Sequence, residues 1–428
     1  MLPEGLSRFI LELAWADMPS DVRSRVASLL RDFVAVSLAG RVTPTARVAV
    51  EYAASQHPGE AATSLFDGRR LSPTGAAWSN GVLANALDFD DGHRLTKGHP
   101  GANVIPAALA VAEAVGATLD QFLAAVTVGY EVALRAGIDL HARSCEYHAS
   151  GAWGALGAAV AAARLLGLDP VQTGHALGLA EYHAPIAPVL RSVQDPAMTK
   201  DACGWGAFLG VSSALLAQRG FTAASSSFAN TDLGSGWHVR DVYVKKFPCC
   251  RWSHPAIEAA LVLRSEAQLE PHRVSKVRLS TFAEAAAIAR RQPETTEEAQ
   301  YSLVWPVSVA LAHGDFSVQH VLEPALGDPA ASRLASLVEV DVDPAFSAAF
   351  PARRFAVVTV ESVDGVVYRS GATEAPGEPE DPGWAEIVQR KFEAFGDELS
   401  TVALRDDSSL SRRSREELLS LLARYDQG

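Results

Sequence analysis

Hydrophobic residues recur at helical spacing through most of the chain. Apolar side chains three and four positions apart define runs at 22–38, 74–87, 102–115, 119–138, 152–166, 171–180 and 206–217. Gly40 and Gly167 end two of these runs, and Asp169-Pro170 opens another, as expected of helix termini. The pattern therefore predicts a large all-helical region, rich in alanine, in the first part of the chain.

The pattern changes after residue 270, where apolar and polar residues begin to alternate. Residues 274–280 alternate most clearly, and 338–342 and 355–362 are similar, which predicts half-buried strands. Asp364-Gly365 predicts a tight hairpin between the last of these strands and 366–369. No strand is predicted before residue 270.

Further helices and one linker complete the predicted organisation. Helices are predicted at 255–265, 307–312, 384–395 and 411–425, and a linker rich in Pro, Gly and Glu at 374–382. The expected fold class is mainly α with an α+β second domain. We expect a discontinuous helical domain formed by residues 1–254 and 380–428, and a smaller α+β lid domain over 255–379.

Composition and charge exclude some classes of function. The chain has 428 residues, 48% hydrophobic and 20% charged, so it can bury a large core. It carries 37 Lys and Arg against 50 Asp and Glu, a formal net charge of −13. This charge argues against a nucleic-acid partner, which requires a basic face. A few cations in one pocket can still bind a small anion.

The N-terminus and the cysteines bear on the cellular compartment. Residues 1–19 carry Glu4, Glu12 and Asp17 among apolar side chains, which favours an amphipathic helix over a signal peptide. The longest apolar runs fall short of the roughly 18–20 residues that span a bilayer. Four cysteines, two of them adjacent, suit neither a disulfide framework nor a zinc motif. We expect free thiols, a cytoplasmic location and no membrane partner.

The densest polar segment of the helical region, residues 87–100, lies between two apolar helices. It contains three carboxylates and two histidines: Asp88, Asp90, Asp91, His93 and His99. A loop so rich in titratable groups on a rigid scaffold is a candidate catalytic segment. Asp and His are also ligands for a divalent metal, and the simplest alternative is that the carboxylates cap the next helix and face water.

Three further segments carry candidate residues. His148 precedes a helix whose glycines at 151, 154 and 157 favour tight packing; no strand precedes them, so they are not a dinucleotide-binding motif. Lys200 begins a Gly/Ala-rich helix, where a cation opposes the helix dipole unless it faces an anion, and Arg191 can bind a carboxylate with its fork of donors. Each of these side chains has a structural or solvated alternative.

The fourth segment, residues 245–254, lies where the helical region gives way to the mixed region. It carries Lys245, Lys246, Arg251 and His254. Clefts between domains are favoured sites for small molecules. These cations predict a local positive pocket, and the alternative is a basic hinge loop.

Taken together, these segments resemble the MmgE/PrpD family, which includes 2-methylcitrate dehydratase, cis-aconitate decarboxylase and iminodisuccinate epimerase. The resemblance extends from about residue 10 to about residue 400 and rests on the order of several motifs. They are Asn80-Gly81, LDFDDGH at 87–93, His99-Pro100, GYE at 129–131, YHASGAWGALGAA at 147–159, MTKDACGWGA at 198–207, GFT at 220–222 and KKFPCCRWSHPAIEA at 245–259.

The resemblance implies a large helical domain, a smaller α+β lid and a homodimer, with no metal and no cofactor. It places five residues in the pocket: Asp88, His99, His148, Lys200 and Lys245. Two positions depart from the family. Gly92 stands where dehydratase and decarboxylase members tend to have Thr, and Trp305 where they tend to have Tyr. These departures put the family's best-known substrates in doubt.

The expected function is that of a cofactor-independent, dehydratase-like lyase acting on a small di- or tricarboxylic acid. His148 or His99 would remove a proton next to a carboxylate, because imidazole titrates near working pH. Lys200, Lys245 and Arg251 would bind carboxylates and stabilise the enediolate, while Asp88 orients a neighbouring side chain. The alternatives are a decarboxylase, an epimerase of a dicarboxylic amino or imino acid, and a non-catalytic carboxylate-binding homologue.

Overall fold

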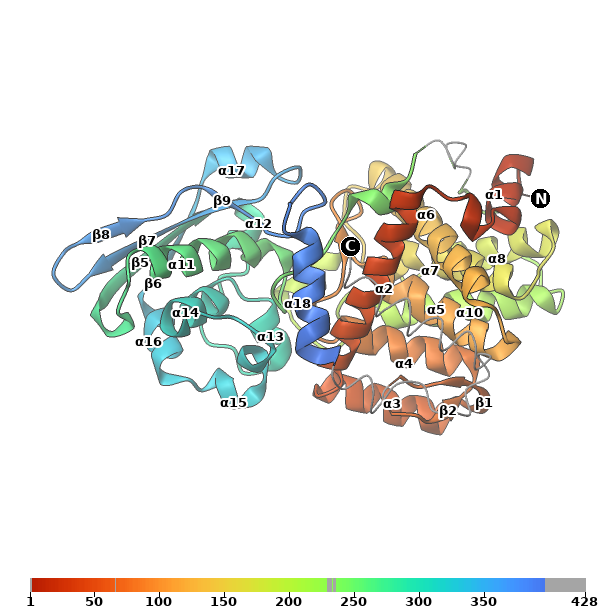
Figure 1. The fold of residues 1–428 in the computed structure, drawn as a ribbon, viewed down its shortest axis with the longest axis horizontal. Helices are drawn as coiled ribbons and strands as arrows, with labels where there is room; N and C mark the ends of the chain where they lie inside the picture. The colour runs from red at the N-terminus through yellow and green to blue at the C-terminus, as the bar shows by residue number, and fades with distance from the viewer. Residues whose placement is uncertain (1, 66, 229–232, 234–235, 397–428) are drawn as a thin grey trace.

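The computed structural model describes residues 2–65, 67–228, 233 and 236–396, which form two parts lying side by side (Figure 1). The larger part is helical, and the smaller part combines a sheet with helices. The helices of the larger part, in chain order, are α1 (Glu4–Glu12), α2 (Ser20–Gly40), α3 (Pro44–Gln56), α4 (Pro73–Asn85), α5 (Gly101–Val115), α6 (Leu119–Arg143), α7 (Gly151–Leu165), α8 (Pro170–Tyr182), α9 (Val189–Gln194) and α10 (Cys203–Gln218). Each predicted run in this part overlaps one of them.

Helix α7 lies at the centre of the larger part and packs against α5, α6, α8 and α10. This close packing depends on glycine. A Cβ added at Gly157 would overlap the carbonyl oxygen of Gly129 on α6, and one added at Gly154 would overlap Asn103 on α5. The glycine spacing at the start of α7 therefore serves helix packing, as expected, because close-packed interiors leave no room for the extra atom.

The larger part also contains short strands, so the expectation of none before residue 270 is wrong. β1 (Pro58–Thr63) pairs with β2 (Arg70–Leu71), and β3 (Gly92–His93) pairs with β4 (Val242–Tyr243). Three of these strands have only two residues, too few for an alternating pattern. The β3–β4 pair matters for the site, because it joins the acidic loop before α5 to the segment that leads out of the helical part.

The smaller part is built on a five-stranded sheet. Its strands are β5 (Val274–Thr281), β6 (Val338–Val342), β7 (Phe355–Ser362), β8 (Val367–Arg369) and β9 (Thr373–Glu374). The order is β6-β5-β7-β8, with β9 also paired to β7; β5 and β6 are parallel, and the other pairs are antiparallel. The predicted hairpin at Asp364-Gly365 is confirmed, with Gly365 at a φ of 82°.

Helices cover and connect this sheet. They are α11 (His254–Glu266), α12 (Ala283–Ala286), α13 (Thr296–Gln300), α14 (Val304–His313), α15 (Glu323–Leu326), α16 (Pro329–Leu337) and α17 (Pro344–Ala349). α11 packs on β7, α16 packs on β5, and α14 packs on both of these helices. The fold is therefore mainly helical with an α+β second part, as the sequence predicted.

The last described helix, α18 (Trp384–Gly396), returns to the helical part and packs against α2 (Figure 1). Its Lys391 ammonium is buried and contacts Oδ1 of Asp32 on α2 at 2.6 Å. The same ammonium donates to the carbonyl oxygen of Phe89 at 2.9 Å. The helix predicted at 411–425 lies outside the described residues.

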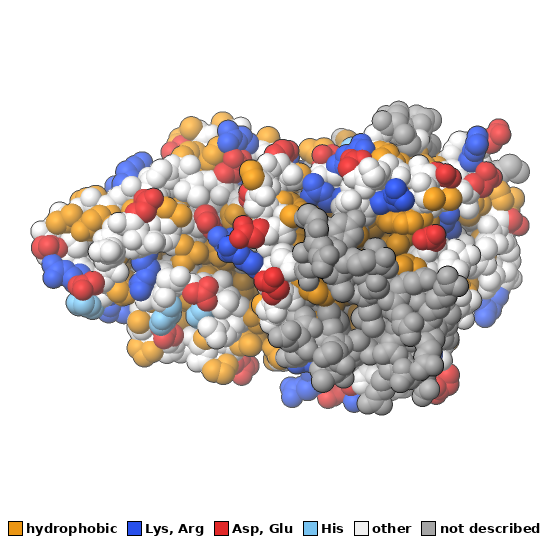
Figure 2. Space-filling model, in the orientation of Figure 1, with side chains coloured by type: hydrophobic (Ala, Val, Ile, Leu, Met, Phe, Trp, Pro, Cys, Tyr) orange, Lys and Arg blue, Asp and Glu red, His pale blue; other side chains and the backbone are white. Residues whose placement is uncertain are grey.

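The surface carries acidic and basic side chains intermixed. Figure 2 shows this mixture over the sheet-containing part, on the left of the view. No single helix among the described residues is long and apolar enough to cross a membrane; α2 and α3, bent by 95°, pass the length and composition test only as a pair. Cys203, Cys249 and Cys250 are buried free thiols, and Cys145 is an exposed one.

Candidate active site

The predicted acidic loop lies between α4, which ends at Asn85, and α5, which begins at Gly101. All three of its carboxylates are buried, as is His99. Asp88 adopts a φ of 49°, a left-handed conformation that costs energy for a residue with a Cβ. The loop does not face water, so that half of the helix-cap alternative is wrong, but Asp91 does accept a hydrogen bond from the backbone N–H of Gly101 at the start of α5, at 3.0 Å.

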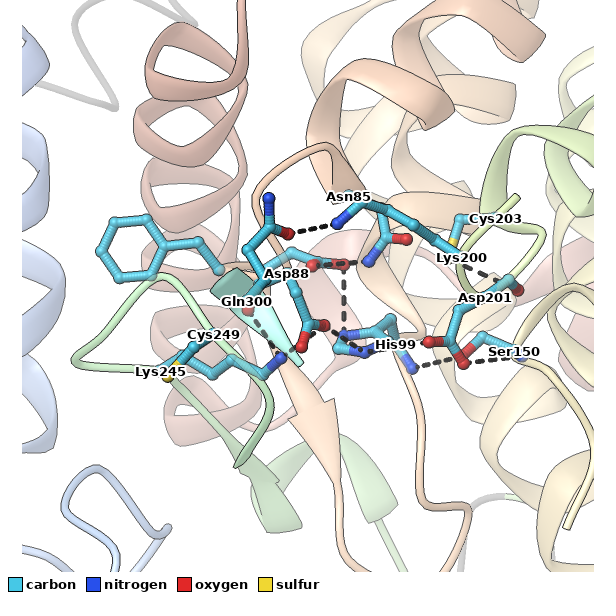
Figure 3. A network of polar contacts seen from close by, with 12 residues as sticks. Asn85, Asp88, His99, Ser150, Lys200, Asp201, Cys203, Lys245, Cys249 and Gln300 are labelled. Carbon is cyan, nitrogen blue, oxygen red and sulfur yellow. Dashed lines mark hydrogen bonds and ion pairs between the residues drawn. The ribbon is translucent and has the colours of Figure 1, made fainter. Parts of the chain in front are cut away.

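His99 lies at the centre of a network of carboxylates (Figure 3). Its Nε2 is 3.2 Å from Oδ1 of Asp88 and 3.8 Å from Oδ2 of Asp201. Its Nδ1 is 3.3 Å from Oδ2 of Asp90 and 2.8 Å from the carbonyl oxygen of Asp91. Both ring nitrogens therefore face oxygen acceptors, which fits an imidazolium that donates from both sides.

This environment controls the charge of His99. Burial alone would lower its pKa, but the carboxylates of Asp90, Asp88 and Asp201 outweigh burial and raise the pKa to about 9. At neutral pH the ring thus carries a proton on each nitrogen. A protonated imidazole donates protons, so the resting state of His99 is that of an acid.

Lys245 forms the strongest ion pair of the site. Its Nζ lies 2.7 Å from both Oδ1 and the backbone carbonyl oxygen of Asp88. Burial would raise the pKa of Asp88, but Lys245 and His99 hold it below its usual range. Burial would lower the pKa of Lys245, and Asp88 raises it instead. Both groups are therefore charged, and Asp88 is fixed between the ammonium and the imidazole.

Lys200 is buried without a carboxylate partner. Its Nζ donates to the side-chain amide oxygen of Gln300 and lies 5.5 Å from the ring centroid of Tyr301, and it makes no ion pair with a described residue. Burial lowers its pKa from the ordinary value of a lysine. Its backbone is strained, with a φ of 42°. A cation buried next to a neutral amide is poorly stabilised, and an incoming anion would supply the missing charge.

Gln300 joins the two parts of the molecule at the site. It ends α13 in the smaller part, and its amide nitrogen donates to the carbonyl oxygen of Ala86 at 3.3 Å. The neighbouring Tyr301 directs its hydroxyl at Asp201, 3.5 Å away. This network therefore lies where the two parts meet, a place that favours small-molecule sites.

Other carboxylates support this network. Asp201 accepts a hydrogen bond from Ser150 Oγ at 3.0 Å, and Asp90 accepts one from Asn85 at 2.9 Å. Asp91 accepts from the hydroxyl of Tyr130 at 2.7 Å. Burial raises the pKa of Asp91 to about 7, and it raises the pKa of Asp90 as well.

Two predicted residues lie apart from this cluster. The ring of His148 stacks with that of His141, and its Nε2 is 3.1 Å from Oγ of Ser144; no described contact joins it to the cluster. Arg191 is exposed on α9. The structure therefore does not place either side chain with His99 and Lys200.

Arg251 is buried but already has a partner. Its guanidinium lies 2.9 Å from Oε1 of Glu378, which also contacts Arg354 at 3.3 Å. The guanidinium also lies over the ring of Tyr243, 4.5 Å from its centroid. In this structure Arg251 thus holds the segment before α18 against β4, and it is not a free cation.

Gly92 and Trp305, the two positions expected to differ from the family, each have a close local neighbour. A Cβ added at Gly92 would overlap the ring and hydroxyl of Tyr243, its partner in the β3–β4 pair. Tyr243 therefore fills the space that a larger residue 92 would need. Trp305 is fully buried, and its indole N–H donates to the carbonyl oxygen of His320 at 3.1 Å.

Asp88, Asp90 and His99 have ligand atoms within 4.8 Å of one another, so the residue types fit a cation. The ammonium of Lys245 already meets Asp88 at 2.7 Å. A divalent ion here would face that ammonium at close range. Asp88, Asp90 and His99 are therefore better suited to pairing with the ammonium of Lys245 than to binding a metal ion.

Sequence reasoning missed several members of the site. Asp201 lies in the segment that was singled out for Lys200, and Tyr130 lies in the GYE motif at 129–131. Nothing in the sequence around Gln300 or Asn85 indicates a place in the site. Asp201 directly follows Lys200, and this adjacency was the only available indication of its role.

Comparisons with known proteins identify the family of the chain. The chain matches the MmgE/PrpD N-terminal domain over residues 4–244 and the MmgE/PrpD C-terminal domain over 247–410. The two matches cover nearly all of the sequence, and the chain belongs to the MmgE/PrpD family.

Several curated proteins are similar to it. It is 29% identical over 299 residues to the cis-aconitate decarboxylase-like protein oryM of Aspergillus oryzae, a match that covers 60% of this chain and 61% of that protein. It is 28% identical over 343 residues to cis-aconitate decarboxylase of Aspergillus terreus, covering 70% and 69%. It is 28% identical over 358 residues to the human cis-aconitate decarboxylase, covering 76% and 73%.

Proposed function

We propose that this chain is a cofactor-independent lyase that acts on a small di- or tricarboxylic acid. The observation that carries the proposal is Lys200, a buried ammonium that contacts the neutral amide of Gln300 and the ring of Tyr301 but forms no ion pair with a described residue. Such a cation is stabilised when a substrate carboxylate supplies the opposite charge. The family and the decarboxylase relatives support the same class of substrate.

The reaction builds negative charge on carbon next to a carboxylate. In a decarboxylation the bond between that carbon and the leaving carboxylate breaks, carbon dioxide departs, and the electron pair spreads into the remaining carboxylate as an enediolate. Lys200 stabilises this charge because it is a fixed cation in a buried site. Asp88 and Lys245 act as positioning residues, since they hold the imidazole ring of His99.

Proton delivery completes the reaction. His99 is protonated at rest, so it gives its proton to the carbanion and regains one from solvent. A protonated His99 can deliver a proton after decarboxylation, but it cannot act as the base that begins a dehydration. The charge of His99 therefore favours decarboxylation. We therefore place the decarboxylase first and the dehydratase second, which reverses the order that the sequence suggested. Activity should fall as the pH rises through about 9.

The experiment is a panel of citrate-like, aconitate-like and aspartate-like acids incubated with the full-length protein in D₂O. Release of carbon dioxide with one deuterium on the product carbon supports the decarboxylase. Formation of an alkene by loss of water supports the dehydratase, and deuterium exchange without net elimination supports the epimerase. Binding of an acid without any reaction would contradict the proposal and favour a non-catalytic carboxylate-binding protein.

Two variants, one in the site and one control, test whether the activity depends on this site. Lys200→Met should lower kcat/KM by a hundredfold or more, at roughly 3 kcal/mol of lost transition-state stabilisation. Lys276→Met removes a half-buried lysine on β5, paired with Glu339 in the sheet-containing part, and should leave the activity unchanged. Equal activity of both variants and the wild type would exclude this site. We further propose that the chain is cytoplasmic and forms a homodimer. Light scattering of the purified chain tests the oligomeric state.

A further inference from the structure

A second cluster of ligating side chains includes a residue of the acidic loop but not His99. It consists of His93, at the end of β3, and of His238 and Asp241 on the 3₁₀ helix η2 (His238–Asp241). These residues play no part in the proposed reaction. One ligand atom from each lies within 4.8 Å of the other two.

The local backbone brings the three side chains together. A 3₁₀ helix has three residues per turn, so His238 and Asp241 project from the same side of η2. Nδ1 of His238 lies 3.6 Å from Oδ2 of Asp241. Antiparallel pairing of His93 with Val242, the residue after η2, then places the third side chain beside them.

His93 is prepared to act as a ligand. Its ring is buried, and its Nδ1 accepts the backbone N–H of Thr96 at 3.4 Å, which fixes the ring. Its Nε2 makes no hydrogen bond with any described residue. This nitrogen is therefore available to a ligand, and the ring of His93 lies 6.0 Å from that of His238, centroid to centroid.

We propose that His93, His238 and Asp241 bind a divalent transition metal ion, with Zn²⁺ as the best match. Two imidazoles and one carboxylate are a common protein donor set for zinc, with a fourth position left for water. Two ligands of a tetrahedral zinc ion lie about 3.4 Å apart, close to the separation already present between His238 and Asp241. The side chains of His238 and Asp241 are partly exposed, so the ion and its water have access from solvent.

The arginines near this cluster differ in their partners: Arg25 lies over the ring of Trp384 and interacts with Asp241 of the cluster, whereas two others are paired with carboxylates outside it. Arg94 contacts both Glu378 and Glu380, and Arg240 contacts Asp21. These contacts reduce the repulsion that each guanidinium would exert on a cation bound at the cluster.

The ion would act on the candidate active site through the backbone. His93 follows Asp91 and Gly92 in the acidic loop, and Asp241 precedes Lys245 by four residues. A metal bound across β3 and η2 would therefore clamp the loop that carries Asp88 to the strand that leads to Lys245. Its role would be structural, and the proposed reaction would not pass through it.

The test is a titration of the metal-stripped, full-length protein with Zn²⁺ by calorimetry, and with Co²⁺ as a spectroscopic probe. We expect one ion per chain, visible absorption bands for tetrahedral Co²⁺, and a higher Tm with Zn²⁺. His238→Ala and Asp241→Asn should each weaken binding at least tenfold. His272→Ala, at an exposed histidine of the sheet-containing part, should leave the affinity unchanged.

Two outcomes would overturn the proposal. One is the absence of stoichiometric binding to the wild type. The other is binding that neither His238→Ala nor Asp241→Asn weakens. Both variants alter partly exposed side chains, and circular dichroism establishes that they fold, so a loss of affinity reports on the site itself. Neither outcome bears on the proposed lyase activity, which is measured separately.

Discussion

Single residues in this site differ by whether their buried charge has a partner. Lys245 meets the carboxylate of Asp88, and its pKa is raised; Lys200 meets the amide of Gln300, and its pKa is lowered. Burial is comparable for the two lysines, so the partner decides the direction of the shift. The same contrast separates a positioning lysine from one that is available to a substrate.

This contrast predicts opposite effects on stability. Lys245→Met leaves Asp88 buried without its strongest partner and should lower the free energy of unfolding by about 3–5 kcal/mol. Lys200→Met removes a poorly compensated charge and should leave the free energy of unfolding unchanged or raise it. Urea unfolding measures both. A similar loss in both variants would mean that Lys200 is a structural residue.

The raised pKa of His99 predicts a pH dependence of stability. The folded-state pKa, about 9, lies above the unfolded value, near 6.5, so His99 binds its proton more tightly in the folded protein. Its contribution is fully present below pH 6.5 and is lost as the pH rises through about 9. The difference in unfolding free energy between wild type and His99→Asn should therefore shrink from about pH 6 to about pH 10. A constant difference would contradict the assignment.

The sequence predicted part of this site, for a physical reason. Asp88, His99, Lys200 and Lys245 belong to segments whose density of charge is unusual in an apolar, helical chain. Gln300 is an ordinary polar residue at the end of a short helix, and only the packing of two distant segments gives it a role. His148 shows the converse, because its place before α7 was predicted correctly while its side chain faces His141.

Among the elements, the β3–β4 pair controls the shape of the site. It sets Gly92 opposite Tyr243 and leads directly to Lys245. Most helices longer than about ten residues were predictable because the period of their apolar residues repeats several times, but α3, with 13 residues, was not predicted. A two-residue strand contains no period, and its pairing depends on residues about 150 positions apart in the chain. The sequence could therefore predict the helical scaffold but not this pair.

The contact between Gly92 and Tyr243 predicts a coupled effect on stability. Gly92→Ala should lower the free energy of unfolding by about 1–3 kcal/mol, because the new methyl group overlaps the tyrosine ring. In a Tyr243→Ala background the same substitution should cost less than about 0.5 kcal/mol. Gly5→Ala, where a Cβ meets no atom within 4 Å, serves as the control. Additive effects in the double variant would refute the contact.

At the scale of the whole molecule, α18 ties the end of the described chain back to its beginning. It follows the sheet-containing part in sequence but packs on α2 of the helical part (Figure 1). The ammonium of Lys391 bridges Asp32 on α2 and the carbonyl oxygen of Phe89, which lies between two site carboxylates. One buried lysine thus connects the overall architecture to the acidic loop.

Breaking the contact between Lys391 and Asp32 should greatly lower the stability of the protein. Lys391→Met leaves Asp32 buried without a partner and should lower the free energy of unfolding by about 3–5 kcal/mol. Arg390→Ala removes an exposed i,i+4 pair with Glu386 on the same helix and should cost less than about 1 kcal/mol. Thermal unfolding of the two variants gives the comparison. Equal, small effects would mean that α18 contributes little to the helical part.

Because α18 packs on α2, the helical part cannot complete its packing until α18 has been synthesised. Asp32 and Lys391 are 359 positions apart, so at roughly 5–20 residues per second the ribosome delivers the ammonium about 20–70 seconds after the carboxylate. Throughout that interval α2 exposes the surface that α18 later covers, and the acidic loop lacks one of its supports. A ribosome-bound chain halted before α18 should therefore be cleaved by protease faster in its helical part than the released protein. The last described helix thus completes packing that α2 leaves open early in synthesis.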